Sequence, residues 1–131
     1  RWYHYRFHSA DATSAVGRFR TAPAADDAVA DGMRFAVAAC QHWETGHYAA
    51  YRHMLADELD LVLHLGDYIY ENDTPGPAVR RHVGAEPVTL ADYRRRYAQY
   101  RGDPDLQAAH AACAWAAVWD DHEVQNDYVG D

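Results

Sequence analysis

Side chains that could bind a metal follow three separate apolar runs of this 131-residue chain. Cys40 follows the first run, Asp67 and Tyr70 follow the second, and the polar string 120–123 follows the third. In open α/β sheets the chemistry lies just outside the carboxyl ends of the strands. Carboxylates suit hard cations, and a thiolate together with a phenolate suits a trivalent ion such as Fe³⁺ better than Mg²⁺ or Ca²⁺. If the runs are parallel strands, the residues alone are compatible with a metal site, including the two-metal site of a hydrolase.

The apolar runs themselves read as short buried strands, and the segments between them read as helices. The strands are expected at residues 34–39, 61–66 and 114–119. Residues 47–60 carry tyrosine and leucine at helical spacing, which makes the first two strands part of a right-handed βαβ unit. A second helix is expected at 90–101, and Asp103-Pro104 is a good cap and first turn for a third, through about residue 112.

The segments outside this unit are a hairpin and two irregular stretches. Residues 2–8 alternate in the manner of a strand, and 15–21 is its expected partner across a turn at 11–14. Two strands alone are only marginally stable, so this pair is expected to belong to a larger sheet. Residues 22–32 read as a linker, and 72–89, with three prolines and two glycines, read as an irregular excursion.

Composition restricts the function further. The formal net charge of −8 argues against non-specific binding to nucleic acid or to an anionic membrane. No apolar run is long enough for a transmembrane helix, and the two cysteines do not form a disulfide scaffold. Because the chain starts without methionine or a signal peptide, we expect it to be processed or to be part of something longer.

Five strings in the chain resemble the PhoD family of alkaline phosphatases, which are calcineurin-like metallophosphoesterases. The most specific are Gly66-Asp67-Tyr68-Ile69-Tyr70-Glu71 and 119–128, which contains Asp121-His122-Glu123. The pair Cys40-Gln41 and the segments 103–110 and 16–23 are similar as well, so the resemblance covers nearly the whole chain.

The resemblance implies an α/β fold that is part of a metallophosphatase αββα sandwich. Residues 1–23 would be the last strands of an N-terminal β-sandwich domain, 24–33 a linker, and 34–131 the N-terminal half of the metallophosphatase domain. Further ligands would come from a C-terminal half that this chain lacks. We therefore expect this chain to be a fragment that is inactive alone.

The resemblance also implies a secreted or cell-envelope enzyme that hydrolyses phosphate esters with a metal-activated hydroxide at an Fe³⁺–Ca²⁺ centre. Cys40 looks like the thiolate ligand of iron, Asp67 like the bridging carboxylate and Tyr70 like the phenolate ligand. Asp121 would bind the second metal. The partner implied is a small phosphate ester, with no specificity for nucleic acid, and the oligomeric state is left open.

By the same resemblance, His122 would contact the phosphate or protonate the leaving group, and Asn126 is a weaker candidate for binding the substrate there. Two alternatives stay open at this point: a phospholipase D-like phosphodiesterase, and a non-catalytic metal-binding domain that retains the fold.

Other polar and aromatic residues have simpler interpretations. Tyr68 is expected to pack, Cys113 to be structural, and Arg94–Arg96 to form a solvated helix face. The remaining histidines read as surface or core residues, with His64 the one expected to be buried. They are His42, His47, His53, His64, His82 and His110.

Overall fold

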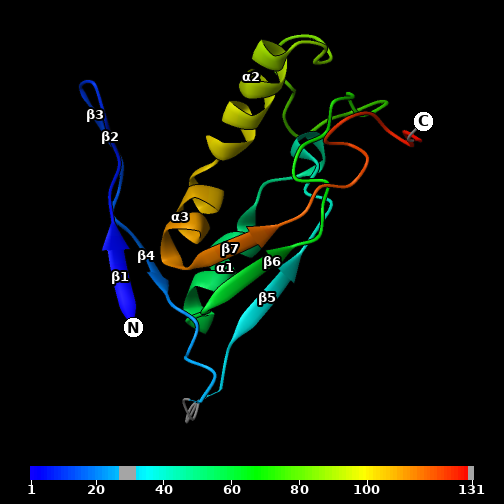
Figure 1. Ribbon diagram of the computed structural model, residues 1–131. Coiled ribbons are helices and arrows are strands. Elements are labelled where there is room, and N and C mark those ends of the chain that lie inside the picture. Colours follow the sequence, from blue (N-terminus) through cyan, green and yellow to red (C-terminus); the bar gives the residue numbers. More distant parts are fainter. Residues whose placement is uncertain (27–31, 130–131) are drawn as a thin grey trace.

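A three-stranded parallel sheet forms the centre of the chain (Figure 1). The computed structural model describes residues 1–26 and 32–129, so part of the predicted linker lies outside the described residues. The sheet contains β5 (Phe35–Ala38), β6 (Leu61–His64) and β7 (Ala114–Ala117) in the order β5-β6-β7. Both strand pairs are parallel, with Phe35 opposite Leu61 and Leu61 opposite Ala114. The predicted βαβ arrangement is therefore confirmed, although each strand is shorter than predicted.

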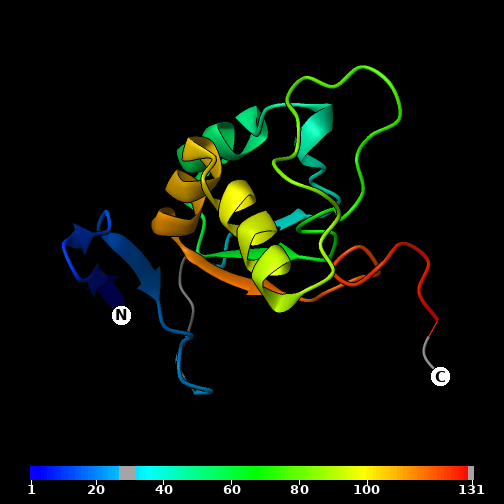
Figure 2. The same ribbon diagram turned by 90° about the horizontal axis from the view of Figure 1, so that it is seen from above.

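The helices cover one face of this sheet (Figure 2). They are η1 (Trp43–Thr45), α1 (Ala49–Met54), η2 (Leu55–Asp57), α2 (Leu90–Arg101) and α3 (Pro104–Ala112). Aromatic side chains dominate the core between helices and sheet, where Tyr100, Ile69 and Leu106 are fully buried. Tyr68 packs in the same core and bonds His110 Nε2 at 2.8 Å, as predicted for a packing residue.

Helix ends follow the local capping chemistry. The Thr89 side chain and Asp92 form a capping box at the start of α2, and the Asp103 carboxylate accepts N–H bonds at the start of α3. These two helices have the predicted bounds. The helix predicted at 47–60 is shorter, because the chain turns at Glu58, whose φ of 49° is left-handed.

The other face of the sheet is open. Phe35 and Val37 of β5 are each 56% exposed, and Leu65 and Val118 just beyond the neighbouring strands are exposed as well. The prediction that 34–39 is a buried strand is therefore wrong: four of its six residues are exposed, and Ala36 and Ala38 are only half-buried. Since both faces carry apolar residues, while the helices cover only one of them, the sequence pattern indicates a strand that is buried on both sides.

A β-ribbon precedes the sheet. In it β1 (Trp2–Tyr5) pairs antiparallel with β4 (Gly17–Arg20), and β2 (His8–Ser9) pairs with β3 (Ala12–Thr13). The connecting turn lies at residues 10–11 rather than at 11–14, because Ala10 takes a left-handed φ of 47°. Tyr5 Oη donates to His110 O at 3.3 Å and Arg18 Nε donates to Ala112 O at 3.0 Å, which attaches the ribbon to the end of α3.

The excursion at 72–89 forms no helix and no strand, as predicted, and its last residue, Thr89, caps α2. The interpretation of Arg94–Arg96 as a solvated face is wrong for Arg96, which is only 3% exposed. Its guanidinium donates to the carbonyl oxygens of Tyr70 at 2.6 Å, Glu71 at 3.0 Å and Ala85 at 3.2 Å. Arg96 therefore ties α2 to both ends of the excursion.

Gly66 provides a test of how closely the loops after β6 and β7 approach. Its φ is +104°, and an added Cβ would lie 2.5 Å from Asp120 Cβ, whereas Gly76 has a similar φ of +97° and open space around it. We expect Gly76→Ala to lower the free energy of unfolding by about 1 kcal/mol and Gly66→Ala to lower it by about 3 kcal/mol or more. Urea unfolding measures both, and equal losses would contradict the close approach.

Candidate metal centre

The loops after β5 and β6 continue to pair with one another beyond the sheet. Cys40 N donates to Gly66 O at 3.2 Å, and Gln41 N donates to Asp67 O at 3.1 Å. Gln41 is buried, and its amide nitrogen donates to Tyr68 O at 2.8 Å. The side chains that follow β5 and β6 are therefore held side by side by backbone bonds, as expected for the ends of neighbouring parallel strands.

Asp67 is the residue around which the candidate ligands gather. Its Oδ2 accepts hydrogen bonds from Cys40 Sγ at 3.4 Å and from Tyr70 Oη at 2.9 Å. Its Oδ1 is buried and has no hydrogen-bond partner among the described residues. A buried carboxylate oxygen without a partner is costly, and a bound cation would remove that cost.

Asp121 and His122 approach the same carboxylate from the loop after β7. One ligand atom of each of Asp67, Asp121 and His122 lies within 4.8 Å of the others, which is close enough to surround a metal ion. Asp67 thus belongs both to this group and to the set it forms with Cys40 and Tyr70. Because one carboxylate serves both groups, the arrangement has the donors for two neighbouring metal positions.

The backbone at two of these residues is strained. Cys40 and Asp67 each have a φ of 54°, in the left-handed region that residues with a Cβ rarely occupy. Such conformations cost of order 1–3 kcal/mol and concentrate at functional sites. Ala10 and Glu58 have a similar φ in ordinary turns, so at Cys40 and Asp67 the strain adds to the ligand geometry and does not by itself assign a function.

Glu123 holds the strained corner in place. Its Oε2 accepts from Asp67 N at 3.1 Å and from Asp120 N at 2.8 Å, and its Oε1 accepts from Tyr68 N at 2.5 Å. Sequence reasoning assigned Glu123 no role of its own. The only signal in the sequence was its position directly after Asp121-His122, in a segment already predicted to contain site residues.

Comparison with known proteins identifies the family. A family profile described as "PhoD-like phosphatase" matches residues 35–131. The chain belongs to the PhoD-like phosphatase family. It is 52% identical over 132 residues to "Alkaline phosphatase D" of Bacillus subtilis (strain 168), covering 97% of this chain and 22% of that protein. A solved structure titled "Structure of PhoD" matches with a TM-score of 0.90 and 50% identity over 98% of this chain and 25% of that one. The chain thus spans about a quarter of the length of these relatives.

In this PhoD-like chain, the half-buried His122 forms a pair with the buried Glu71. His122 Nδ1 lies 2.8 Å from Glu71 Oε2, and Glu71 is only 1% exposed. Burial lowers the pKa of His122, but the bond to Glu71 and the nearby carboxylates outweigh it, so the pKa is raised. Burial likewise raises the pKa of Glu71, but the bonds from His122 and from the backbone outweigh it, so that pKa is lowered. With Nδ1–H donating to Glu71, Nε2 is the nitrogen that His122 can offer to a substrate.

Asn126 reaches this pair through its backbone rather than its amide. Asn126 N donates to Glu71 Oε1 at 2.6 Å, while its side chain donates to Asp127 Oδ2 at 2.9 Å. The structure therefore places Asn126 beside Glu71, and its role in substrate binding stays a prediction.

The Cys40 thiol and the Tyr70 phenol keep their protons until a metal binds. Burial, followed by the neighbouring Asp67, raises the pKa of the Cys40 thiol and of the Tyr70 phenol. Metal binding at this site must therefore release protons, and metal affinity should rise with pH.

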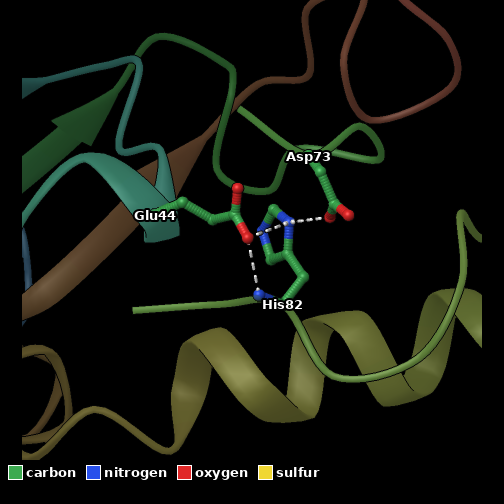
Figure 3. Close-up of side chains that lie close together, drawn as sticks. All are labelled: Glu44, Asp73 and His82. Carbon is green, nitrogen blue, oxygen red and sulfur yellow. Dashed lines mark hydrogen bonds and ion pairs between the residues drawn. The ribbon is translucent and has the colours of Figure 1, made fainter. Parts of the chain in front are cut away.

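A second group of metal-binding residue types, Glu44, Asp73 and His82, lies on the excursion and the loop after β5 (Figure 3). Glu44 is fully buried, and its carboxylate accepts from Thr74 N at 2.6 Å and from His82 N at 2.9 Å. His82 Nδ1 in turn lies 3.2 Å from Asp73 Oδ1. Because Glu44 is already occupied by backbone donors, we interpret this group as the anchor of the excursion rather than as a metal site.

This anchor makes stability depend on pH. Burial raises the pKa of Glu44, but the backbone bonds of His82 and Thr74 outweigh it and lower that pKa below its ordinary value of 4.5. The stabilisation is therefore complete above about pH 4.5 and is lost as the pH falls through the lower, folded-state value. Glu44→Gln should cost roughly 1–3 kcal/mol at pH 7 and flatten the acid slope in urea unfolding. The control is Glu86→Gln, at an exposed residue of the same excursion, which should change neither the free energy of unfolding nor its dependence on pH. An unchanged acid slope in Glu44→Gln would contradict the role of Glu44 as the anchor of the excursion.

Proposed function

We propose that the protein containing this chain is a metal-dependent phosphatase that hydrolyses phosphate esters, as the name of its relative from B. subtilis suggests. The observation that carries the proposal is the buried Oδ1 of Asp67, which has no hydrogen-bond partner among the described residues. The other oxygen of this carboxylate accepts from Cys40 and Tyr70, and Asp121 and the His122–Glu71 pair lie close by. A donor set of this kind fits a cation, and the adjacent imidazole fits proton transfer to a phosphate ester.

The proposed metals are Fe³⁺, held by Cys40, Asp67 and Tyr70, and Ca²⁺, held by Asp67 and Asp121. The thiol and the phenol favour the trivalent ion for the first position, and carboxylate oxygens suit the second. When bound, the ions supply Lewis-acid polarisation of the phosphate and activation of a water.

The chain's own residues provide orientation and proton transfer. His122 would donate a proton from Nε2 to the leaving-group oxygen, while Glu71 stabilises the protonated ring through Nδ1. Glu123 and the backbone bonds of Cys40 and Gln41 keep Asp67 in its strained position, so little reorganisation is needed when the ligands close on a metal. Asn126 would bind the substrate at the same edge.

We further propose that the rest of the site comes from outside this chain. Residues 1–23 would end a β-sandwich domain, 24–33 would link it, and 34–131 would form the N-terminal half of the metallophosphatase domain. The open face of the sheet, with Phe35 and Val37 exposed, supports a second layer packed there in the longer protein. A structure of that protein with this face still open would contradict the proposal.

The location and the ester preference are also proposals. Among the described residues, no helix has the length and apolarity needed to cross a bilayer. An extracellular or cell-envelope location follows from the family resemblance, and fractionation of the source cells tests it. The mono- or diester preference is tested by comparing p-nitrophenyl phosphate with bis-p-nitrophenyl phosphate.

The longer protein should hydrolyse p-nitrophenyl phosphate only in its metal-loaded form, and chelation should abolish turnover. His122→Ala should lower kcat by roughly 10²–10⁴ because the general acid is lost, whereas His47→Ala, at an exposed histidine, should leave it unchanged. Unchanged turnover in His122→Ala would refute the assignment. Turnover by the 131-residue chain alone would refute the need for further ligands.

Glu71→Gln should change the pH profile as well as the rate. The carboxylate raises the pKa of His122, so its removal lowers that pKa and the protonated ring is lost at a lower pH. The alkaline limb of the kcat profile should therefore move to lower pH, and Glu86→Gln should leave it in place. If kcat falls but the alkaline limb of its pH profile does not move, Glu71 stabilises the fold and does not set the pKa of His122.

A further inference from the structure

The ring of Tyr70 contacts two imidazole rings. The centroid of the His42 ring is 4.3 Å from that of Tyr70, with an interplanar angle of 48°. The His122 ring is 4.1 Å away, at 35°. The two histidines come from different loops, the one after β5 and the one after β7, so all three strand ends meet at this phenol.

His42 is itself fixed by hydrogen bonds that do not involve Tyr70. Its Nδ1 accepts from Glu44 N at 3.1 Å, which makes His42 the N-cap of η1. Its Nε2 lies 3.3 Å from Thr74 Oγ1. The ring is therefore held against Tyr70 by the same loop and excursion that Glu44 ties together.

We propose that His42 is a positioning residue that, with His122, holds the Tyr70 phenol in the orientation needed to bind a metal. The proposal rests on the proposed function, in which Tyr70 is a phenolate ligand. Tyr70 Oη lies 2.9 Å from Asp67 Oδ2 with both rings in place. Without the His42 ring, the phenol loses one of these two ring contacts, and the Tyr70 side chain gains torsional freedom that metal binding must remove.

His42 has two separable roles, which allows a matched pair of variants. His42→Asn keeps a side-chain oxygen that can cap η1 but removes the ring beside Tyr70, because asparagine is a favourable N-cap. His42→Phe keeps an aromatic ring beside Tyr70 but removes the capping acceptor. A role confined to capping would therefore be disrupted by phenylalanine and spared by asparagine, while a role in positioning would show the opposite order.

The test uses the longer protein loaded with Fe³⁺ and measures the phenolate-to-iron absorption band together with iron affinity. We expect His42→Asn to shift and broaden the band and to weaken iron binding by about 10-fold, with His42→Phe staying close to wild type. Thermal unfolding of both variants monitors the cap. A wild-type band in His42→Asn, or a shift in His42→Phe as large as in His42→Asn, would overturn the inference.

The outcome also separates this inference from the proposed function. If the wild-type protein binds no iron or shows no phenolate band, the proposed iron centre fails and the role of His42 fails with it. If the wild-type band is present but insensitive to both substitutions, only the role of His42 fails.

Discussion

The site depends on carboxylates that accept hydrogen bonds from the backbone of neighbouring loops. Glu44 joins the loop after β5 to the excursion, and Glu71 joins the loop after β6 to the loop after β7. Glu123 joins the same two loops, but its side chain comes from the loop after β7 and accepts from the backbone of the loop after β6. Glu44 and Glu71 are buried, and Glu123 is half-buried. Bonds of this charge-assisted kind are about twice as strong as neutral ones.

These bonds supplement the backbone pairing that continues past β5 and β6 at Cys40 and Gln41, because the regular ladder of the parallel sheet ends before the ligands. Beyond Ala38, His64 and Ala117, the strands no longer impose a regular spacing on the chain. The glutamates add specific contacts to backbone N–H groups of the loops, including the buried N–H of His82. The same bonds that satisfy the loops therefore also fix where Asp67 and His122 lie.

Much of the fold was predictable, because it follows from local signals. The apolar runs indicated the three parallel strands, and Thr89 and Asp103 marked the starts of α2 and α3. The meeting of Cys40, Asp67 and Tyr70 followed from the parallel topology alone. The glutamate contacts and the burial of Arg96 did not follow, since each joins residues far apart in the sequence and no local pattern distinguishes such a side chain from a solvated one.

The left-handed backbone at Cys40 and Asp67 restricts which substitutions these positions can accept. Glycine and asparagine enter that conformation readily, whereas β-branched residues such as threonine and valine are strongly disfavoured there. A change of ligand at either position must therefore satisfy the backbone before it can satisfy any metal. The conformation of the main chain thus narrows the paths by which the donor set of this site can evolve.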